Sequence, residues 1–388
     1  MNLEGKITIR LKLNDEGVSD VSIESRRILH ATRVLQGRSL EEAVQMVPCI
    51  FTLCATAQAS AAAQAGEQAI GQTPAAEVVA LRQALVDMES LREHLWRILL
   101  DWPGFYGAEP QRESMADVMR LAGAYRGALI GSEDPFRPGA GDLQMDTGLA
   151  SQLLTQLAER LKHSIYGRPV ADWMGLEQVE ALEAWAMSGE SVAARLVRQL
   201  LQDAWAGSGA CGIGALPELE TAPLAEAMTR DGFIEQPDWE GACYETGCLP
   251  RNQSPLMDAL RQRYGNGLLT RILARLTEVA RLWQALACGF AQARMPRALG
   301  QDQVGMGQVA AARGLLVHRI ALHGGQVEDY RILAPTEWNF HPRGVVAQAL
   351  SGLRGDAGRI ERQTRLLINA VDPCVAYELQ IDPGVKDA

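Results

Sequence analysis

The sequence predicts a mainly helical α+β protein, in which a large helical core is joined by small β-hairpins. The chain has 388 residues, 47% of them hydrophobic, which is enough to bury a large core. Apolar residues recur at three- and four-residue spacing through most of residues 39–290, which is the period of a helix. Period-two alternation is confined to short stretches near the two ends of the chain.

The first alternating stretch, residues 5–25, predicts an N-terminal β-hairpin. Ile7, Ile9 and Leu11 fall on one face of the pattern, and Asp15-Glu16-Gly17 supplies a turn.

The helical region begins at a capping signature. Ser39 followed by Glu42 is a capping box, which marks the start of a helix. Helical patterns then cover residues 74–101, 112–130, 146–165, 176–206 and 254–290. The loops between them carry Pro and Gly, as expected for chain reversals.

The C-terminal part returns to strand character and then to helix. Residues 314–334 alternate around a Gly324-Gly325 turn, which predicts a second hairpin. A last helix at about residues 356–370 leads to Asp372 within the C-terminal segment 344–388. Because no internal repeat or low-complexity linker interrupts the chain, we expect a single domain over residues 1–388.

Charge and composition narrow the class of function. The formal net charge is −10, and no block of Lys and Arg is present, which argues against nucleic acid or an anionic membrane as the main partner. No stretch approaches the roughly 20 apolar residues that a membrane span needs, so we expect a cytoplasmic protein. The seven cysteines would then be thiols or metal ligands instead of disulfides.

Two short patterns have alternative interpretations. The pairs Cys49/Cys54 and Cys243/Cys248 share one spacing. A zinc site formed by these four thiolates is a minor alternative. The favoured interpretation is ordinary buried cysteines, because the cysteine pairs of zinc sites are generally closer in sequence.

Residues 207–212 fit G-x-G-x-x-G. A helical pattern and not a strand precedes them, so we interpret them as a flexible connector and not a nucleotide loop.

Several stretches, in order along the chain, resemble the large subunit of nickel-iron hydrogenases. The matching stretches are residues 3–6 (I-E-G-H in that family), 245–251 (E-x-G-P-L-A-R), 305–314 (G-x-G-x-V-E-A-P-R-G) and 335–343 (P-T-T-W-N-x-x-P-R). With the cysteine motifs, the resemblance spans nearly the whole chain. It implies a hydrogenase large-subunit-like helical bundle.

The first cysteine motif departs from the family pattern. Residues 49–58 align with R-I-C-G-x-C-x-x-x-H. Phe51 replaces the first cysteine, Cys54 retains the second, and Gln58 replaces the histidine.

The second cysteine motif is also reduced. Residues 372–380 align with D-P-C-x-x-C-x-x-H, in which Cys374 is kept while Tyr377 and Gln380 replace the later ligands. Since nickel in that family needs all four thiolates, the resemblance implies that no nickel binds and that hydrogenase activity is absent. Thr32 stands where the family has Glu, and together with Gln380 this implies that the family's magnesium site is lost.

The resemblance also implies which residues would hold iron. Arg313 and Thr336 match the family's hydrogen-bond donors to the two iron-bound cyanides, and Pro335 lines the same pocket. A cyanide nitrogen is an acceptor that carries negative charge, which suits a guanidinium and a hydroxyl. The thiolates of Cys54 and Cys374 would suit the low-spin iron itself.

This combination looks like the hydrogenase expression/formation proteins of the HupK type. The resemblance implies an accessory maturation protein and not an enzyme, a scaffold with no catalytic residues that transiently carries an Fe(CN)2(CO) unit. Its implied partners are small hydrogenase maturation chaperones and the apo hydrogenase large subunit. One alternative is a chaperone that binds no metal and works by protein contact only. A less favoured alternative is a degenerate redox enzyme in which Cys49 supplies a third thiolate.

Overall fold

The computed structural model describes residues 5–26, 29–141, 143–289 and 303–383. Its α-helices are α1 (Leu40–Ile50), α2 (Ala55–Ala69), α3 (Ala76–Trp96), α4 (Trp102–Phe105), α5 (Arg112–Leu129), α6 (Thr147–Arg160), α7 (Val170–Met174), α8 (Val179–Ser188), α9 (Val192–Gln202), α10 (Thr221–Ala227), α11 (Cys248–Arg251), α12 (Pro255–Tyr264), α13 (Leu268–Ala287), α14 (Pro335–Asn339), α15 (Val345–Ser351) and α16 (Ala357–Val371). Its strands are β1 (Lys6–Asn14), β2 (Gly17–Arg26), β3 (Gly214–Ala215), β4 (Tyr244–Glu245), β5 (Val304–Ala311), β6 (Gly314–His323), β7 (Gln326–Leu333) and β8 (Ala376–Asp382).

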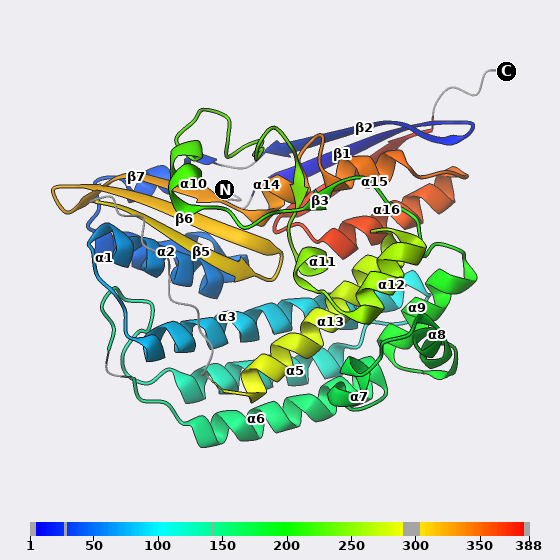
Figure 1. The fold of residues 1–388 in the computed structure, drawn as a ribbon, viewed down its shortest axis with the longest axis horizontal. Coiled ribbons are helices and arrows are strands. Elements are labelled where there is room, and N and C mark those ends of the chain that lie inside the picture. The colour runs from blue at the N-terminus through cyan, green and yellow to red at the C-terminus, as the bar shows by residue number, and fades with distance from the viewer. Residues whose placement is uncertain (1–4, 27–28, 142, 290–302, 384–388) are drawn as a thin grey trace.

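The long helices form one body of the molecule and the sheets lie against it (Figure 1). Helices α3, α5, α6 and α13 run across the lower half of the view, while β5–β7 cover α1 and α2, and β1 and β2 lie beside α15 and α16. The predicted α+β class, with a mainly helical core and small sheets, is confirmed.

Helix α13 lies in the centre of this body and is buried on nearly all sides. Such a helix is a core element, and any charge that it carries needs a partner inside the protein. Arg271 pairs with Glu245 at 3.0 Å, and Arg275 approaches Asp372 at 3.6 Å. The core helix thereby brings buried charge toward the end of α16.

The N-terminal hairpin is present, and it gains a third strand from the other end of the chain. Strands β1 and β2 pair antiparallel, and β8 pairs parallel to β1, from Lys6 opposite Ala376 to Lys12 opposite Asp382. The sequence analysis did not predict β8. Tyr377, Leu379 and Ile381 do alternate, but the strand exists because β1 offers it a partner.

The predicted second hairpin is the pair β6 and β7, and β5 extends it to three strands. Strand β5 lies directly on the alanine-rich helix α2. A Cβ added to Gly305 would lie 1.8 Å from the Ala65 carbonyl oxygen, and one added to Gly307 would lie 2.0 Å from that of Ala61. The strand and helix backbones therefore touch without any side chain between them.

We expect Gly307→Ala to lower the free energy of unfolding by about 3 kcal/mol or more, because the added methyl meets backbone that cannot rotate away. Urea unfolding followed by circular dichroism measures the change. Gly127→Ala is the control, because Gly127 is exposed on α5 with nothing within 4 Å of an added Cβ. This variant should be neutral or slightly stabilising. Equal stability of the two variants would contradict the close contact.

The predicted helical stretches are present, although some are irregular or divided. The capping box is present: the Glu42 N–H donates to Ser39 Oγ at 3.3 Å, and the Ser39 N–H donates to Glu42 Oε2 at 3.1 Å. The patterns at 74–101 and 146–165 each end in a π-helical turn, Arg97–Asp101 and Leu161–Tyr166. The pattern at 176–206 divides into α8 and α9, because Ser191 caps a new helix.

Some sequence expectations concern residues outside the described ranges, namely positions 3–4 of the N-terminal motif and the last residue of the 254–290 pattern. Within the described ranges, no single helix is long and apolar enough to cross a membrane. The helices Leu40–Ile50 and Thr52–Ala69 meet the length and composition test only as a pair, bent by 95°. The assignment of the chain to one domain stays a prediction.

The glycine-rich segment 207–212 is a packed connector. The Leu268 N–H donates to the Ser208 carbonyl, and the Gln363 amide donates to Ser208 Oγ at 2.9 Å. A Cβ on Gly209 would meet Leu367 at 2.5 Å. Our expectation of flexibility is therefore wrong, because the glycines let this segment fit between α13 and α16.

Candidate functional site

Cys54 lies at the sharp corner between α1 and α2. It ends a short 3₁₀ turn and directly precedes α2. No side chain of its own segment caps α2. Instead Glu89 of α3 accepts the N–H groups of Thr56 at 2.8 Å and Ala57 at 3.0 Å. A carboxylate suits the positive end of a helix, so this contact fixes the position of Cys54.

Cys374 follows α16 through an unusual backbone turn. Asp372 ends the helix with φ of +68°, a conformation that costs a non-glycine residue roughly 1–3 kcal/mol. Buried ion pairs hold it there, with Arg97 at 2.9 Å, Arg313 at 3.4 Å and Arg275 at 3.6 Å. The turn directs Cys374 toward Cys54 before the chain enters β8.

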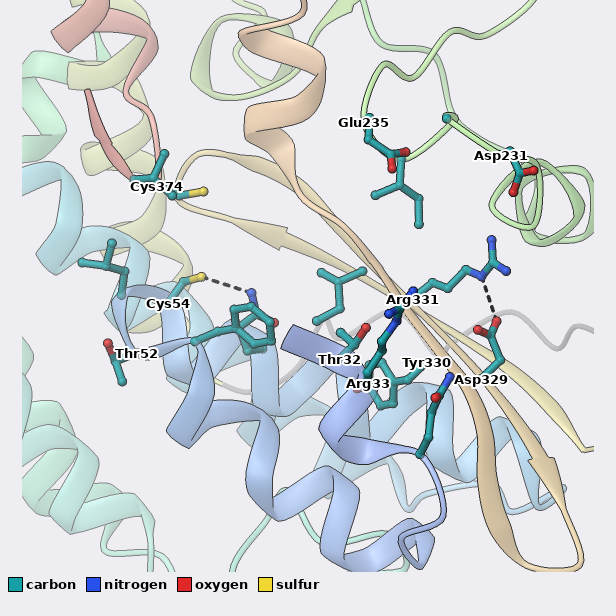
Figure 2. A pocket seen from close by; sticks show the side chains of 18 of the residues that line it. Thr32, Arg33, Thr52, Cys54, Asp231, Glu235, Asp329, Tyr330, Arg331 and Cys374 are labelled. Atoms are coloured by element: carbon teal, nitrogen blue, oxygen red, sulfur yellow. Dashed lines mark hydrogen bonds and ion pairs between the residues drawn. The ribbon is translucent and has the colours of Figure 1, made fainter. Parts of the chain in front are cut away.

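Both cysteines line one pocket of about 420 Å³. Figure 2 shows their sulfur atoms pointing into it from two different segments. The rest of the lining is Thr32, Arg33, Gln36, Phe51, Thr52, Leu53, Gln58, Arg230, Asp231, Gly232, Ile234, Glu235, Asp329, Tyr330, Arg331, Ile332 and Val375. The structure thus brings together the two cysteines that the sequence analysis singled out.

Burial strongly affects the thiol of Cys54. Burial, and then the charges of Glu89 and Cys374, raise the pKa of Cys54 to about 12, although Gln58 and Arg313 act in the opposite direction. Cys54 is therefore a protonated thiol at neutral pH when nothing is bound. A metal that binds here must displace that proton.

Arg313 lies in the turn between β5 and β6, next to the two sulfurs. Its Nη2 donates to Glu93 at 3.2 Å, and its Nε faces Asp372. Burial opposes its charge. The pKa of Arg313 is nevertheless raised by the carboxylates of Asp372 and Glu93 and by the sulfurs of Cys374 and Cys54. It is thus a permanent buried cation within electrostatic reach of both cysteines.

The carboxylate of Asp372 is the negative centre of this network. Burial alone would raise its pKa, but Arg313, Arg97 and Arg275 lower the pKa of Asp372 to about 2. The π-helical turn of Arg97–Asp101 places Arg97 between Asp372 and Asp101, which it contacts at 2.9 Å. The sequence analysis named Asp372 as part of the cysteine motif, but sequence spacing showed neither its strained backbone nor its arginine partners in the turn after α3 and on α13.

Thr336 contacts Cys374 instead of the open pocket. Its Oγ1 accepts the Cys374 N–H at 3.1 Å and lies 2.7 Å from Cys374 Sγ. The hydroxyl oxygen has a second lone pair, so either the hydroxyl or the Cys374 thiol can donate in the contact with the sulfur. Pro335 begins the same helix and is buried. Neither residue, nor Arg313, lines the pocket itself.

A hydrogen-bond chain behind Cys54 was not predicted. Gln58 Nε2 donates to Cys54 Sγ at 3.5 Å, His318 Nε2 lies 2.9 Å from Gln58 Oε1, and Tyr330 Oη lies 2.8 Å from His318 Nδ1. Of its members, the sequence analysis named only Gln58, as the replacement for the family's histidine.

The other cysteines lie elsewhere. Cys49 is exposed and donates to the Gln45 carbonyl at 3.7 Å, so the described geometry does not make it a third ligand. Cys243 contacts His341 at 3.3 Å, and Cys248 contacts His94 at 3.7 Å. In the part of the chain that the structure describes, no three His, Cys, Asp or Glu residues form a metal-binding group. The zinc alternative therefore has no support there.

The two positions that replace later ligands belong to β8. Tyr377 lies opposite Ile7, and Gln380 is exposed, where Arg10 Nε donates to it at 3.0 Å. The chain after Cys374 is thus part of a sheet, and Gln380 faces solvent instead of the site.

Comparison with known proteins identifies the family. The family described as nickel-dependent hydrogenase matches residues 267–377. The hydrogenase expression/formation protein HoxV of Cupriavidus necator is 32% identical over 376 residues, 92% of each chain. The chain belongs to the HupK/HoxV family of hydrogenase expression/formation proteins.

Two further relatives agree with this membership. HupK of Azotobacter vinelandii is 29% identical over 386 residues, 98% of this chain and 99% of that protein. The Ni-Fe-Se hydrogenase from D. vulgaris Hildenborough shares the fold with a TM-score of 0.64 at 18% identity, over 93% of this chain and 94% of that one. The expected membership and the large-subunit-like fold are confirmed.

Proposed function

We propose that this HupK/HoxV family member is an accessory protein of hydrogenase maturation that carries an Fe(CN)2(CO) unit on Cys54 and Cys374. The observation that supports it most is their position: two thiols from opposite ends of the chain line one pocket, with a buried arginine beside them. The names of the relatives support the accessory role. The iron unit is cargo and not a resident cofactor.

Charge and ligand number favour this cargo. Ferrous iron with two cyanides and two thiolates carries two negative charges, and Arg313 supplies a fixed positive charge nearby. Soft thiolates suit such iron, and the donors present fit it. The pocket lining contains Cys54 and Cys374 but no histidine and no further cysteine, so it lacks the two additional thiolates that nickel would need.

Each residue has a limited task in this proposal. Cys54 and Cys374 bind the iron after losing their protons, and the Thr336 hydroxyl holds Cys374 in place. Arg313 balances the charge, and it would donate to a cyanide, as would the Thr336 hydroxyl. Pro335 keeps the turn that carries Thr336. The unit would come from small maturation chaperones and pass to the apo hydrogenase large subunit in the cytoplasm.

Infrared spectroscopy tests this proposal. The protein is purified without oxygen from a host that carries hydrogenase maturation genes, and cyanide and carbonyl stretches are sought. The proposal predicts both. If the wild-type protein lacks them but binds the apo large subunit in a pull-down, the contact-only chaperone is correct instead. Hydrogen uptake by the isolated protein would favour the redox enzyme.

We expect Arg313→Lys to reduce retention of the iron unit about 10- to 100-fold, the range typical of residues that support metal ligands. Lysine keeps the charge but lacks the planar set of donors. Iron remaining after gel filtration measures retention. Arg82→Lys is the matched control, because Arg82 is also buried and pairs with Glu67 at 2.8 Å outside the pocket. Equal retention in both variants would make Arg313 purely structural.

A further inference from the structure

Gln58, His318 and Tyr330 form a row of hydrogen-bonded side chains behind the Cys54 sulfur, and Gln58 is the member that contacts it. Gln58 is 3% exposed and His318 is fully buried. The Gln58 side-chain N–H lies 3.5 Å from the sulfur, while its Oε1 faces His318 Nε2 at 2.9 Å. Gln58 belongs to α2 and His318 to β6, and β6 pairs with β5, whose backbone lies directly on α2. Their positions are therefore rigid.

The side-chain amide of Gln58 determines which atom donates in each hydrogen bond of this row. An amide oxygen only accepts, so His318 must carry its proton on Nε2 and donate it to Gln58. Its Nδ1 is then an acceptor, which makes the Tyr330 hydroxyl the donor at 2.8 Å. Burial lowers the pKa of His318 to about 3 and raises that of Tyr330. The chain therefore keeps one charge state near neutral pH.

We propose that Gln58 is a positioning residue for Cys54, locked by His318 and Tyr330 so that an N–H donor always faces the sulfur. Every member of the chain is satisfied, and such a network is rigid. An amide neither takes up nor releases a proton at neutral pH. Cys54 is thus given a fixed donor that cannot itself exchange a proton, which suits a site that holds a ligand without transforming it.

Two consequences follow for Cys54. The donor stabilises its thiolate against burial and the charge of Glu89. When iron is bound, which rests on the proposed function, the same donor withdraws electron density from the sulfur and hence from the metal. The first consequence concerns the protein without iron. It can therefore be measured whether or not the protein carries the proposed iron unit.

The test is the alkylation rate of Cys54 by iodoacetamide in the iron-free full chain between pH 7 and 10, followed by peptide mass spectrometry. Cys54 lines the open pocket, so the reagent can reach it. Gln58→Leu should slow the reaction about tenfold at each pH, which corresponds to about 1.4 kcal/mol. Gln64→Leu is the control, because Gln64 lies on the same helix and, among the described residues, donates to Ser60 Oγ and not to Cys54; the alkylation rate of Cys54 should be unchanged in this variant.

Gln58→Met serves if the leucine variant does not fold, since an unbranched side chain fills the same space without a donor. An unchanged rate in a folded Gln58→Leu or Gln58→Met protein would overturn the proposal. A second arm uses iron-loaded protein, in which these variants should shift the carbonyl stretch to lower frequency. If the wild type shows no such stretch, the proposed cargo fails while the alkylation result still decides the role of Gln58.

Discussion

Cys374→Ala and Cys54→Ala are each expected to lower retained iron more than about 100-fold, because removing a metal ligand should exceed the 10- to 100-fold effect of removing a supporting residue. Each variant leaves one thiolate, which cannot hold iron in a pocket with no other cysteine or histidine. Metal analysis of protein from the same host measures the loss.

Cys49→Ala is the control for both cysteine variants. Cys49 is exposed and outside the pocket lining, so its loss should leave retention unchanged. Normal iron in either pocket variant would contradict a two-thiolate site. A fall in Cys49→Ala as large as in Cys54→Ala would restore Cys49 as a ligand.

Asp372→Asn is expected to lower the free energy of unfolding by about 3–5 kcal/mol, the usual cost of removing one partner from a buried ion pair. The variant removes the carboxylate that Arg97, Arg275 and Arg313 share. Among the described ion pairs, Arg275 then has no carboxylate partner left. Urea unfolding at pH 7 measures the difference. Asp15→Asn is the control, because Asp15 lies in an exposed turn.

The effect of Asp372 should depend on pH. Its pKa is about 2 in the folded protein, below the unfolded value of about 3.9. The stabilisation from its charge is therefore fully present above about pH 4 and is lost as the pH falls through 2. The stability difference between wild type and Asp372→Asn should shrink over that window. A difference that stays constant to pH 2 would mean that the asparagine acts through backbone shape and not through charge.

Local patterns in the sequence predicted the elements that depend on neighbours along the chain. The β1–β2 hairpin and the helix start at Ser39 follow from alternation and from a capping box, which need no distant partner. Strands β5 and β8 were missed because each depends on a remote surface. β5 needs the alanine face of α2, and β8 needs the free edge of β1.

The site shows the same division. Cys54, Cys374, Arg313 and Thr336 were selected through a resemblance, and the structure places them near one another. The supporting residues Glu89, Arg97 and Arg275 carry no such signal. They come from α3, the π-helical turn after it and α13, and only the folded chain brings their side chains to the ends of α2 and α16.

The pocket is open to solvent, and this openness supports the proposed carrier function. A large-subunit-like fold holds the two thiols at a site that remains open to solvent, with the β7 segment Asp329–Ile332 at its edge (Figure 2). Under the proposed function, the cargo would enter and leave through this opening. The strand β8 pairs with β1 and so anchors the chain beyond Cys374.

X-ray absorption at the iron edge of the loaded protein tests the central claim most directly. The proposal predicts two sulfur scatterers together with cyanide and carbonyl carbons in wild type. The sulfur contribution should be halved in whatever iron remains bound in Cys54→Ala or Cys374→Ala. An iron site without sulfur neighbours, or one whose sulfur signal is unchanged when both cysteines are replaced, would contradict it.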